Sequence, residues 1–264
     1  MTRPPLVVVP QHFGSTVFDR RTSRYMPFDR EATALLAATH ARPFDAVIAE
    51  ALDPGRRDEL AAFFEHFVER GFFTLDRTLD GVVLDATPPA DHLLGPLAVH
   101  LEVVAACNLT CTHCFAGELP RRERPLTLAE LDVLFADLAR LGSFRLGLTG
   151  GEPLMRKDLL EVIDLALGRG LMPCLTTNAH LVTDAVAGGL AARELAWLNV
   201  SLDGATPATN DRVRGAGSFE RALNGIDLLR RNGARFTLAF TILRSNLHEV
   251  RECARLAAHL GAHS

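Results

Sequence analysis

The first ninety residues carry two successive patterns of apolar positions. Short stretches with strand-like composition come first, at residues 6–9, 15–18 and 23–28. Apolar residues then recur with helical spacing in three stretches. The first follows a capping Asp29 and reaches residue 37, the second covers residues 44–52, and the third covers residues 56–70. Gly71 ends the third of these helices, and residues 72–75 and 82–84 are expected to pair as a hairpin. The pattern predicts a small sheet followed by three helices.

From residue 97 onward, strand-like and helix-like stretches alternate. We predict strands at residues 97–105, 144–148, 171–176, 197–202 and 236–242, and helices at 126–141, 159–167, 184–195, 219–231 and 247–260. Thr183 is expected to cap the third helix. Such alternation implies right-handed crossovers and a parallel sheet, either open or curled into a barrel.

A stretch with three prolines and a glycine separates the two patterns and suits a linker. We therefore predict a first domain at residues 1–88, a linker at 89–96 and a second domain at 97–264. Three helices with a following hairpin make the first domain resemble a winged helix.

Composition narrows the class of protein. The chain has 264 residues, 48% of them hydrophobic, which is enough for one large or two smaller cores. A formal net charge of -4 lacks the basic excess that nucleic-acid binding needs. No apolar run reaches the length of a membrane span or a signal-peptide core, so we expect a cytoplasmic protein.

Three of the five cysteines, Cys107, Cys111 and Cys114, fall on one short stretch after the first strand of the second domain. Parallel-sheet proteins place their chemistry at this end of a strand. Three thiolates can hold an iron–sulfur cube and leave one iron open to another molecule. Zinc is the alternative, and it would need a fourth ligand such as His92 or His100.

The spacing Cys-x3-Cys-x2-Cys after the first strand resembles the signature of the radical S-adenosylmethionine (SAM) enzymes. The resemblance implies that Cys107, Cys111 and Cys114 hold a 4Fe-4S cluster, and that SAM binds the open iron through its amino nitrogen and carboxylate. The position before the last cysteine is usually aromatic in that family. Here it is His113, which with Phe115 would border the adenine.

Gly150, Gly151 and Glu152 follow the second predicted strand and resemble the glycine-rich turn of the same family. Two glycines allow the backbone to approach a ligand closely, and a carboxylate can accept from an ammonium group. The resemblance assigns this turn to the methionyl amine of SAM. On its own, the pair of glycines is equally typical of a tight turn between a strand and a helix.

Small polar residues end the next strands and also resemble family positions. The resemblance implies that Ser201 and Arg214 hold the methionyl carboxylate, since arginine offers paired donors to two oxygens. Asn178 and Asp203 would contact the ribose or the substrate. Thr241, at the end of the fifth strand, is a weaker candidate. Each of these residues taken singly also fits a cap, a turn or a surface charge.

The first domain resembles the peptide-recognition domains of enzymes that modify ribosomally made peptides, such as the small chaperone of pyrroloquinoline quinone biosynthesis. In such domains a leader peptide adds a strand beside the third strand and packs on the third helix, here residues 23–28 and 56–70. A DNA-binding winged helix is disfavoured because the third helix carries acidic residues among its arginines.

Together these resemblances predict an α/β protein with a partial (β/α) barrel of the radical SAM type. The barrel ends after five units where the family has six, and no cysteine-rich extension follows, so we expect a fragment of a longer protein. The implied activity is that of an oxidoreductase. A reduced 4Fe-4S cluster, supplied by an electron donor, cleaves SAM to a 5'-deoxyadenosyl radical that modifies a precursor peptide. The alternatives are a radical SAM enzyme for a small-molecule or cofactor precursor and a zinc-stabilised regulatory protein.

Overall fold

The computed structural model describes residues 3–51, 53–114 and 124–263. The chain divides into two compact units, one formed by Met1–Leu97 with Asp137–Phe144 and the other by Ala98–Ala136 with Arg145–Ser264. Each unit is described by itself below. Among the described residues, no helix is both long and apolar enough to cross a membrane.

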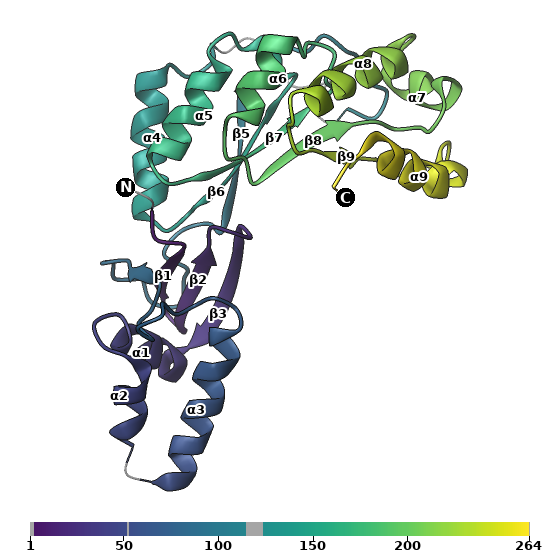
Figure 1. Cartoon of the computed structure of the whole chain (residues 1–264). Helices are drawn as coiled ribbons and strands as arrows, with labels where there is room; N and C mark the ends of the chain where they lie inside the picture. Colours follow the sequence, from purple (N-terminus) through teal and green to yellow (C-terminus); the bar gives the residue numbers. More distant parts are fainter. Residues whose placement is uncertain (1–2, 52, 115–123, 264) are drawn as a thin grey trace. The chain divides into compact units, whose positions relative to one another are not determined.

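The sheet of the first unit has four strands in the order β3-β2-β1-β4. Strands β1 (Leu6–Gln11), β2 (Gly14–Asp19) and β3 (Arg24–Asp29) form the predicted antiparallel meander (Figure 1). The side chains of β1 and β2 are almost all buried, whereas β3 is half exposed. Strand β3 lies at the edge of this sheet, and β2 is its one neighbour among the described strands.

The predicted hairpin of residues 72–75 with 82–84 is wrong. Instead, β4 (Gly81–Val83) pairs in parallel with β1, and Leu6 lies opposite Gly81. The intervening residues form a tight turn of their own, in which Phe73 bridges Leu79. Two adjacent valines suit any strand, so the sequence pattern could identify the strand without identifying its partner.

Three helices follow the meander: α1 (Arg30–Ala38), α2 (Phe44–Ala49) and α3 (Pro54–Val68). The predicted cap is confirmed, because Asp29 Oδ1 accepts from the backbone N–H of Ala32 at 2.8 Å. A stacked pair, Phe44 and Phe64, joins α2 to α3 with ring centroids 5.0 Å apart. Gly71, at φ +70°, takes the left-handed conformation that ends the third helix.

The second unit holds a five-stranded sheet in sequence order, β5-β6-β7-β8-β9, with every pair parallel. Its strands are β5 (Ala98–Val104), β6 (Arg145–Gly150), β7 (Met172–Thr177), β8 (Trp197–Ser201) and β9 (Thr237–Ala239). The predicted parallel sheet is confirmed. Its order brings the carboxyl ends of all five strands to one edge, where the candidate site residues follow.

Helices connect these strands (Figure 1): α4 (Leu128–Arg140), α5 (Leu159–Gly168), α6 (Asp184–Ala191), α8 (Ser218–Arg231) and α9 (Val250–Leu260). Two short 3-10 turns are Pro153–Met155 and Leu247–Glu249. The cap at Thr183 is confirmed, since its hydroxyl accepts from Val186 N. One helix, α7 (Pro207–Arg214), was not predicted. It begins with the cap Thr206 and a proline in its first turn, a recognisable start signal.

Candidate functional site

The cysteine loop, residues 105–114, directly follows β5. Its three cysteines carry free thiols, of which that of Cys111 is about half buried. Burial raises the pKa of Cys111, and the neighbouring thiols of Cys107 and Cys114 raise it further, while Arg214 opposes them. The thiols of Cys107 and Cys114 therefore lie near that of Cys111.

The cysteine loop is held from two sides by hydrogen bonds. On one side, Asn178 Nδ2 donates to Asn108 Oδ1 at 2.8 Å, which ties the loop to the end of β7. On the other, Thr112 N donates to the carbonyl oxygen of Val213 at 2.9 Å, near the end of α7. The two bonds thus tie the loop to the end of β7 and to α7.

The three cysteine thiols fit the 4Fe-4S cluster that the cysteine motif implies. Three unpaired thiols on one loop, which lose their protons on metal binding, match the incomplete ligand shell of a cluster with one open iron. Within the described part of the chain, no group of three or more His, Cys, Asp or Glu side chains is arranged to hold a single metal ion. Ligands at the corners of a cube stand farther apart than ligands around one ion, so this finding leaves the cluster assignment intact.

Gly150, the last residue of β6, and Gly151 after it pack against the backbone at the end of β5 and just after it. A Cβ on Gly150 would come 2.1 Å from the carbonyl oxygen of Val104, and one on Gly151 would come 2.2 Å from that of Ala106. Gly151 N and Glu152 N donate to these two carbonyls, both at 2.9 Å. The lack of a side chain at both glycines therefore lets the turn after β6 pack onto the start of the cysteine loop. This packing role does not depend on any contact with a ligand.

Glu152 is buried and already accepts three hydrogen bonds. Thr177 Oγ1 donates to Oε1 at 2.6 Å, Asn178 N donates to Oε2 at 2.7 Å, and Leu154 N donates to Oε1 at 3.0 Å. Burial raises the pKa of Glu152 although these donors oppose it. A carboxylate has about four acceptor positions, so roughly one stays open for an ammonium group.

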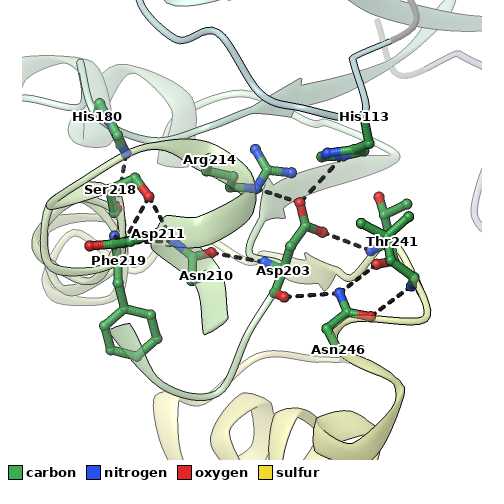
Figure 2. Close-up of polar contacts among 11 residues, drawn as sticks. His113, His180, Asp203, Asn210, Asp211, Arg214, Ser218, Phe219, Thr241 and Asn246 are labelled. Atoms are coloured by element: carbon green, nitrogen blue, oxygen red, sulfur yellow. Dashed lines mark hydrogen bonds and ion pairs between the residues drawn. The ribbon is translucent and has the colours of Figure 1, made fainter. Parts of the chain in front are cut away.

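Asp203 follows β8 and has no exposed surface. Figure 2 shows its carboxylate meeting three segments: Oδ2 lies 2.7 Å from Arg214 Nε and 3.4 Å from His113 Nε2, and Oδ1 accepts from Thr241 N at 2.8 Å. Asp203 therefore faces other parts of the chain. Thr241 contributes its backbone N–H to this arrangement.

Arg214 ends α7 and is nine-tenths buried beside the cysteine loop. Its charge opposes the rise that burial causes in the pKa of Cys111 and of Glu152. Ser201 is the last residue of β8 and is partly buried. Arg214 thus lies near Cys111, Glu152 and Asp203 at the carboxyl edge of the sheet. Phe115, the other predicted adenine neighbour, lies outside the described residues.

Sequence reasoning missed the polar residues that support this arrangement. Asn210 Oδ1 accepts from Asp203 N at 2.9 Å, and Asn246 Nδ2 donates to the carbonyl oxygen of Asp203 at 3.0 Å (Figure 2). Asp211 accepts from Ser218 Oγ and from two backbone N–H groups beyond α7. Asn210, Ser218 and Asn246 have no exposed surface. The sequence carries no clear signal for them, because asparagine and serine are usually exposed.

Comparison with curated proteins finds relatives with different activities. The chain is 35% identical to mycofactocin maturase MftC of Mycolicibacterium smegmatis over 170 residues, which cover 63% of this chain and 43% of that protein. It is 37% identical to AdoMet-dependent heme synthase of Methanosarcina barkeri over 171 residues, which cover 63% of this chain and 48% of that protein. The chain thus spans less than half the length of these relatives.

Among solved structures, the fold matches that of Streptococcus suis SuiB bound to precursor peptide SuiA, with a TM-score of 0.70 and 14% identity. The match covers 98% of this chain and 60% of SuiB, so it takes in both units. At this identity the likeness concerns the fold. SuiB has also been solved bound to S-adenosylmethionine, with the same TM-score.

The model of the radical SAM superfamily matches residues 101–257, which include the three cysteines, Glu152 and Arg214. This match favours a cluster over the zinc alternative, because members of the superfamily use a 4Fe-4S cluster with SAM. With its cysteine loop and polar strand ends gathered at one edge of a parallel sheet, the chain belongs to the radical SAM superfamily.

Proposed function

We propose that this chain belongs to a radical SAM enzyme that modifies a ribosomally synthesised precursor peptide. The observation that carries the proposal is the fold match to SuiB, a protein solved with a precursor peptide, because it extends over 98% of the chain. The similarity to a mycofactocin maturase supports the same reading. Five free cysteines suit a reducing compartment, so the proposal places the protein in the cytoplasm with an electron donor as partner.

In this proposal Cys107, Cys111 and Cys114 hold the 4Fe-4S cluster. When bound, the reduced cluster supplies the electron that cleaves SAM and so provides a radical able to remove a hydrogen atom from the substrate. The chain's own share is to bind and orient. Arg214 presents a buried positive charge near Cys111, which suits the methionyl carboxylate together with Ser201.

The remaining predicted contacts belong to the same proposal. Glu152 keeps an acceptor position for the methionyl amine beside Gly150 and Gly151. His113 and Phe115 border the adenine. Asn178 is almost fully buried and bonded to Asn108, so it reaches the ribose or the substrate only at the rim of the cysteine loop.

The first unit offers a place for a leader peptide. Strand β3 is an edge strand, and an edge presents backbone donors and acceptors that an extended peptide can use. Met26 on β3 and Phe63 and Phe67 on α3 are partly buried against one apolar core, which provides side-chain contacts beside that edge. Nucleic acid fits less well, because Arg56 of α3 is paired with Glu31 and Glu59.

The test uses protein reconstituted with iron and sulfide without oxygen and supplied with SAM, a reductant and peptides encoded beside its gene. We expect 5'-deoxyadenosine to form together with a mass change in one peptide. Removing the leader from that peptide should abolish the mass change, and adding the leader as a separate peptide should partly restore it. The Cys111→Ala variant serves as the cluster-deficient control. A mass change equal with and without the leader contradicts the assignment of the first unit.

A second candidate is a radical SAM enzyme for a small molecule of the tetrapyrrole class. The similarity to AdoMet-dependent heme synthase favours it, at an identity close to that with the maturase. The two candidates differ in what the first unit does. Turnover of a tetrapyrrole that is indifferent to added peptide, with no peptide modified, would establish the second candidate in place of the first.

A further inference from the structure

Asp203 stands apart from the other acidic groups of the second unit because its carboxylate meets three separate segments. Its side chain has no exposed surface, yet it contacts His113 of the cysteine loop, Arg214 of α7 and the backbone of Thr241 after β9 (Figure 2). Its own backbone is held by Asn210 and Asn246. A carboxylate fixed in this way cannot turn toward a ligand without breaking several contacts.

The contact with Arg214 is made through one side of the guanidinium. Asp203 Oδ2 lies 2.7 Å from Nε (Figure 2). Among the described residues, no hydrogen bond is made by either terminal nitrogen. The contact at Nε is an ion pair without the geometry of a hydrogen bond, so the charge of Asp203 holds the guanidinium in place and leaves its two terminal nitrogens for another acceptor.

We propose that Asp203 is a positioning residue that aims the terminal nitrogens of Arg214 at the carboxylate of bound SAM and does not itself contact the cofactor. This replaces the expectation that Asp203 reaches the ribose or the substrate. The inference rests on the assignment of SAM to this site and is independent of whether the substrate is a peptide.

The geometry separates the role of Asp203 from cluster retention. The cysteine loop is also held by the bond between Asn178 and Asn108 and by the bond from Thr112 N to Val213 O. Replacing Asp203 by asparagine keeps the size of the side chain and an oxygen that can accept from Thr241 N. It removes the charge that orients Arg214. Cluster content should therefore persist while SAM binding weakens.

The experiment compares reconstituted wild-type chain with Asp203→Asn. We expect the same iron and sulfide content per chain and an affinity for SAM, measured by equilibrium dialysis, lower by about tenfold, the usual size of a coupling within a buried charge network. The electron paramagnetic resonance spectrum of the reduced cluster should change on SAM addition in both proteins. In Asp203→Asn this change should need a correspondingly higher SAM concentration.

Glu249→Gln is the matched control. Glu249 is also a buried carboxylate held by α7, where it accepts from Thr206, Thr209 and the backbone of Ala205, but no contact joins it to Arg214. SAM affinity should be unchanged in this variant. If both variants lose affinity equally, the effect is general loosening of α7 and the proposal is overturned.

A double variant tests whether Asp203 acts through Arg214. Arg214→Gln should weaken SAM binding, and adding Asp203→Asn to it should cause no further loss. Additive losses, or wild-type affinity in Asp203→Asn alone, overturn the proposal. Should Asp203→Asn fail to fold, Arg214→Lys carries the test, because lysine keeps the charge without the paired nitrogens. SAM affinity at the wild-type level in that variant also refutes the inference.

Discussion

The close backbone contact between Gly151 and the start of the cysteine loop predicts the effect of the substitution Gly151→Ala. A Cβ at this position would lie 2.2 Å from the carbonyl oxygen of Ala106, 2.4 Å from its carbonyl carbon and 2.7 Å from the carbonyl oxygen of Ala105. All three are backbone atoms, so no side chain can rotate away. The two segments would have to separate by about 1 Å to restore ordinary contact in a close-packed interior.

The cost follows from what that separation breaks. Overpacking of this kind costs about 1–3 kcal/mol, and the hydrogen bonds from Gly151 N and Glu152 N, both 2.9 Å, contribute about 1 kcal/mol each. We expect Gly151→Ala to lower the free energy of unfolding of the metal-free chain by about 2–5 kcal/mol. Because the displaced segment leads directly into Cys107, iron uptake on reconstitution should fall as well.

Urea unfolding followed by circular dichroism measures the stability, and iron analysis measures the uptake. Gly168→Ala is the control, since a Cβ at Gly168, the last residue of α5, would meet no atom within 4 Å. Alanine there should leave stability unchanged or raise it by up to about 1 kcal/mol through helix propensity. The prediction is refuted if Gly151→Ala and Gly168→Ala have the same free energy of unfolding and take up the same amount of iron per chain.

Three other predictions concern single side chains. Burial raises the pKa of Glu152 in the folded chain above the ordinary glutamate pKa of 4.5. The protonated side chain therefore contributes fully to the free energy of unfolding below pH 4.5. This contribution is lost as the pH rises through the higher pKa of the folded state. Glu152→Gln should flatten the dependence of the urea midpoint on pH over that window, and an unchanged slope contradicts this. Tyr25→Phe removes a hydroxyl bonded at 2.7 Å to two backbone groups, a loss of about 1–3 kcal/mol by the same assay, whereas a neutral effect would show that water replaces the hydroxyl. Burial raises the pKa of Cys174 and Cys253 to about 11, so about 0.1% of each is thiolate at pH 8. Mass spectrometry after brief alkylation of the native metal-free chain should find exposed Cys114 modified first, with all five cysteines reacting only after unfolding.

The periodic parts of the fold could be predicted from the sequence because each was fixed by local chemistry. The caps at Asp29 and Thr183 and the alternation of strands and helices follow from signals that lie within a few residues of one another. The partner of β4 could not be predicted, since two valines suit either neighbour and the choice depends on a turn closed by Phe73 and Leu79. Helix α7 was missed because its polar composition carries no apolar stripe.

The candidate site was predicted in part for a similar reason. Motif positions such as Cys111 and Glu152 follow strand ends that a parallel sheet must bring to one edge. Which groups those side chains contact depends on tertiary packing. Asp203 is the clearest case, because the sequence shows an aspartate in a turn and the structure shows a carboxylate enclosed by Arg214 and His113.

Strand β3 contains a proline, and this limits what can add to the sheet at that edge. Pro27 lies opposite Thr16 and has no amide hydrogen, so a neighbouring chain finds no donor at its position. Arg24 and Asp29, both exposed, place a charge at each end of the strand. Two copies of the protein laid edge to edge would therefore form a broken ladder with charges at its ends, which discourages aggregation. A short guest strand that stops before Pro27 avoids this penalty, so the same edge can disfavour self-association and still accept a peptide.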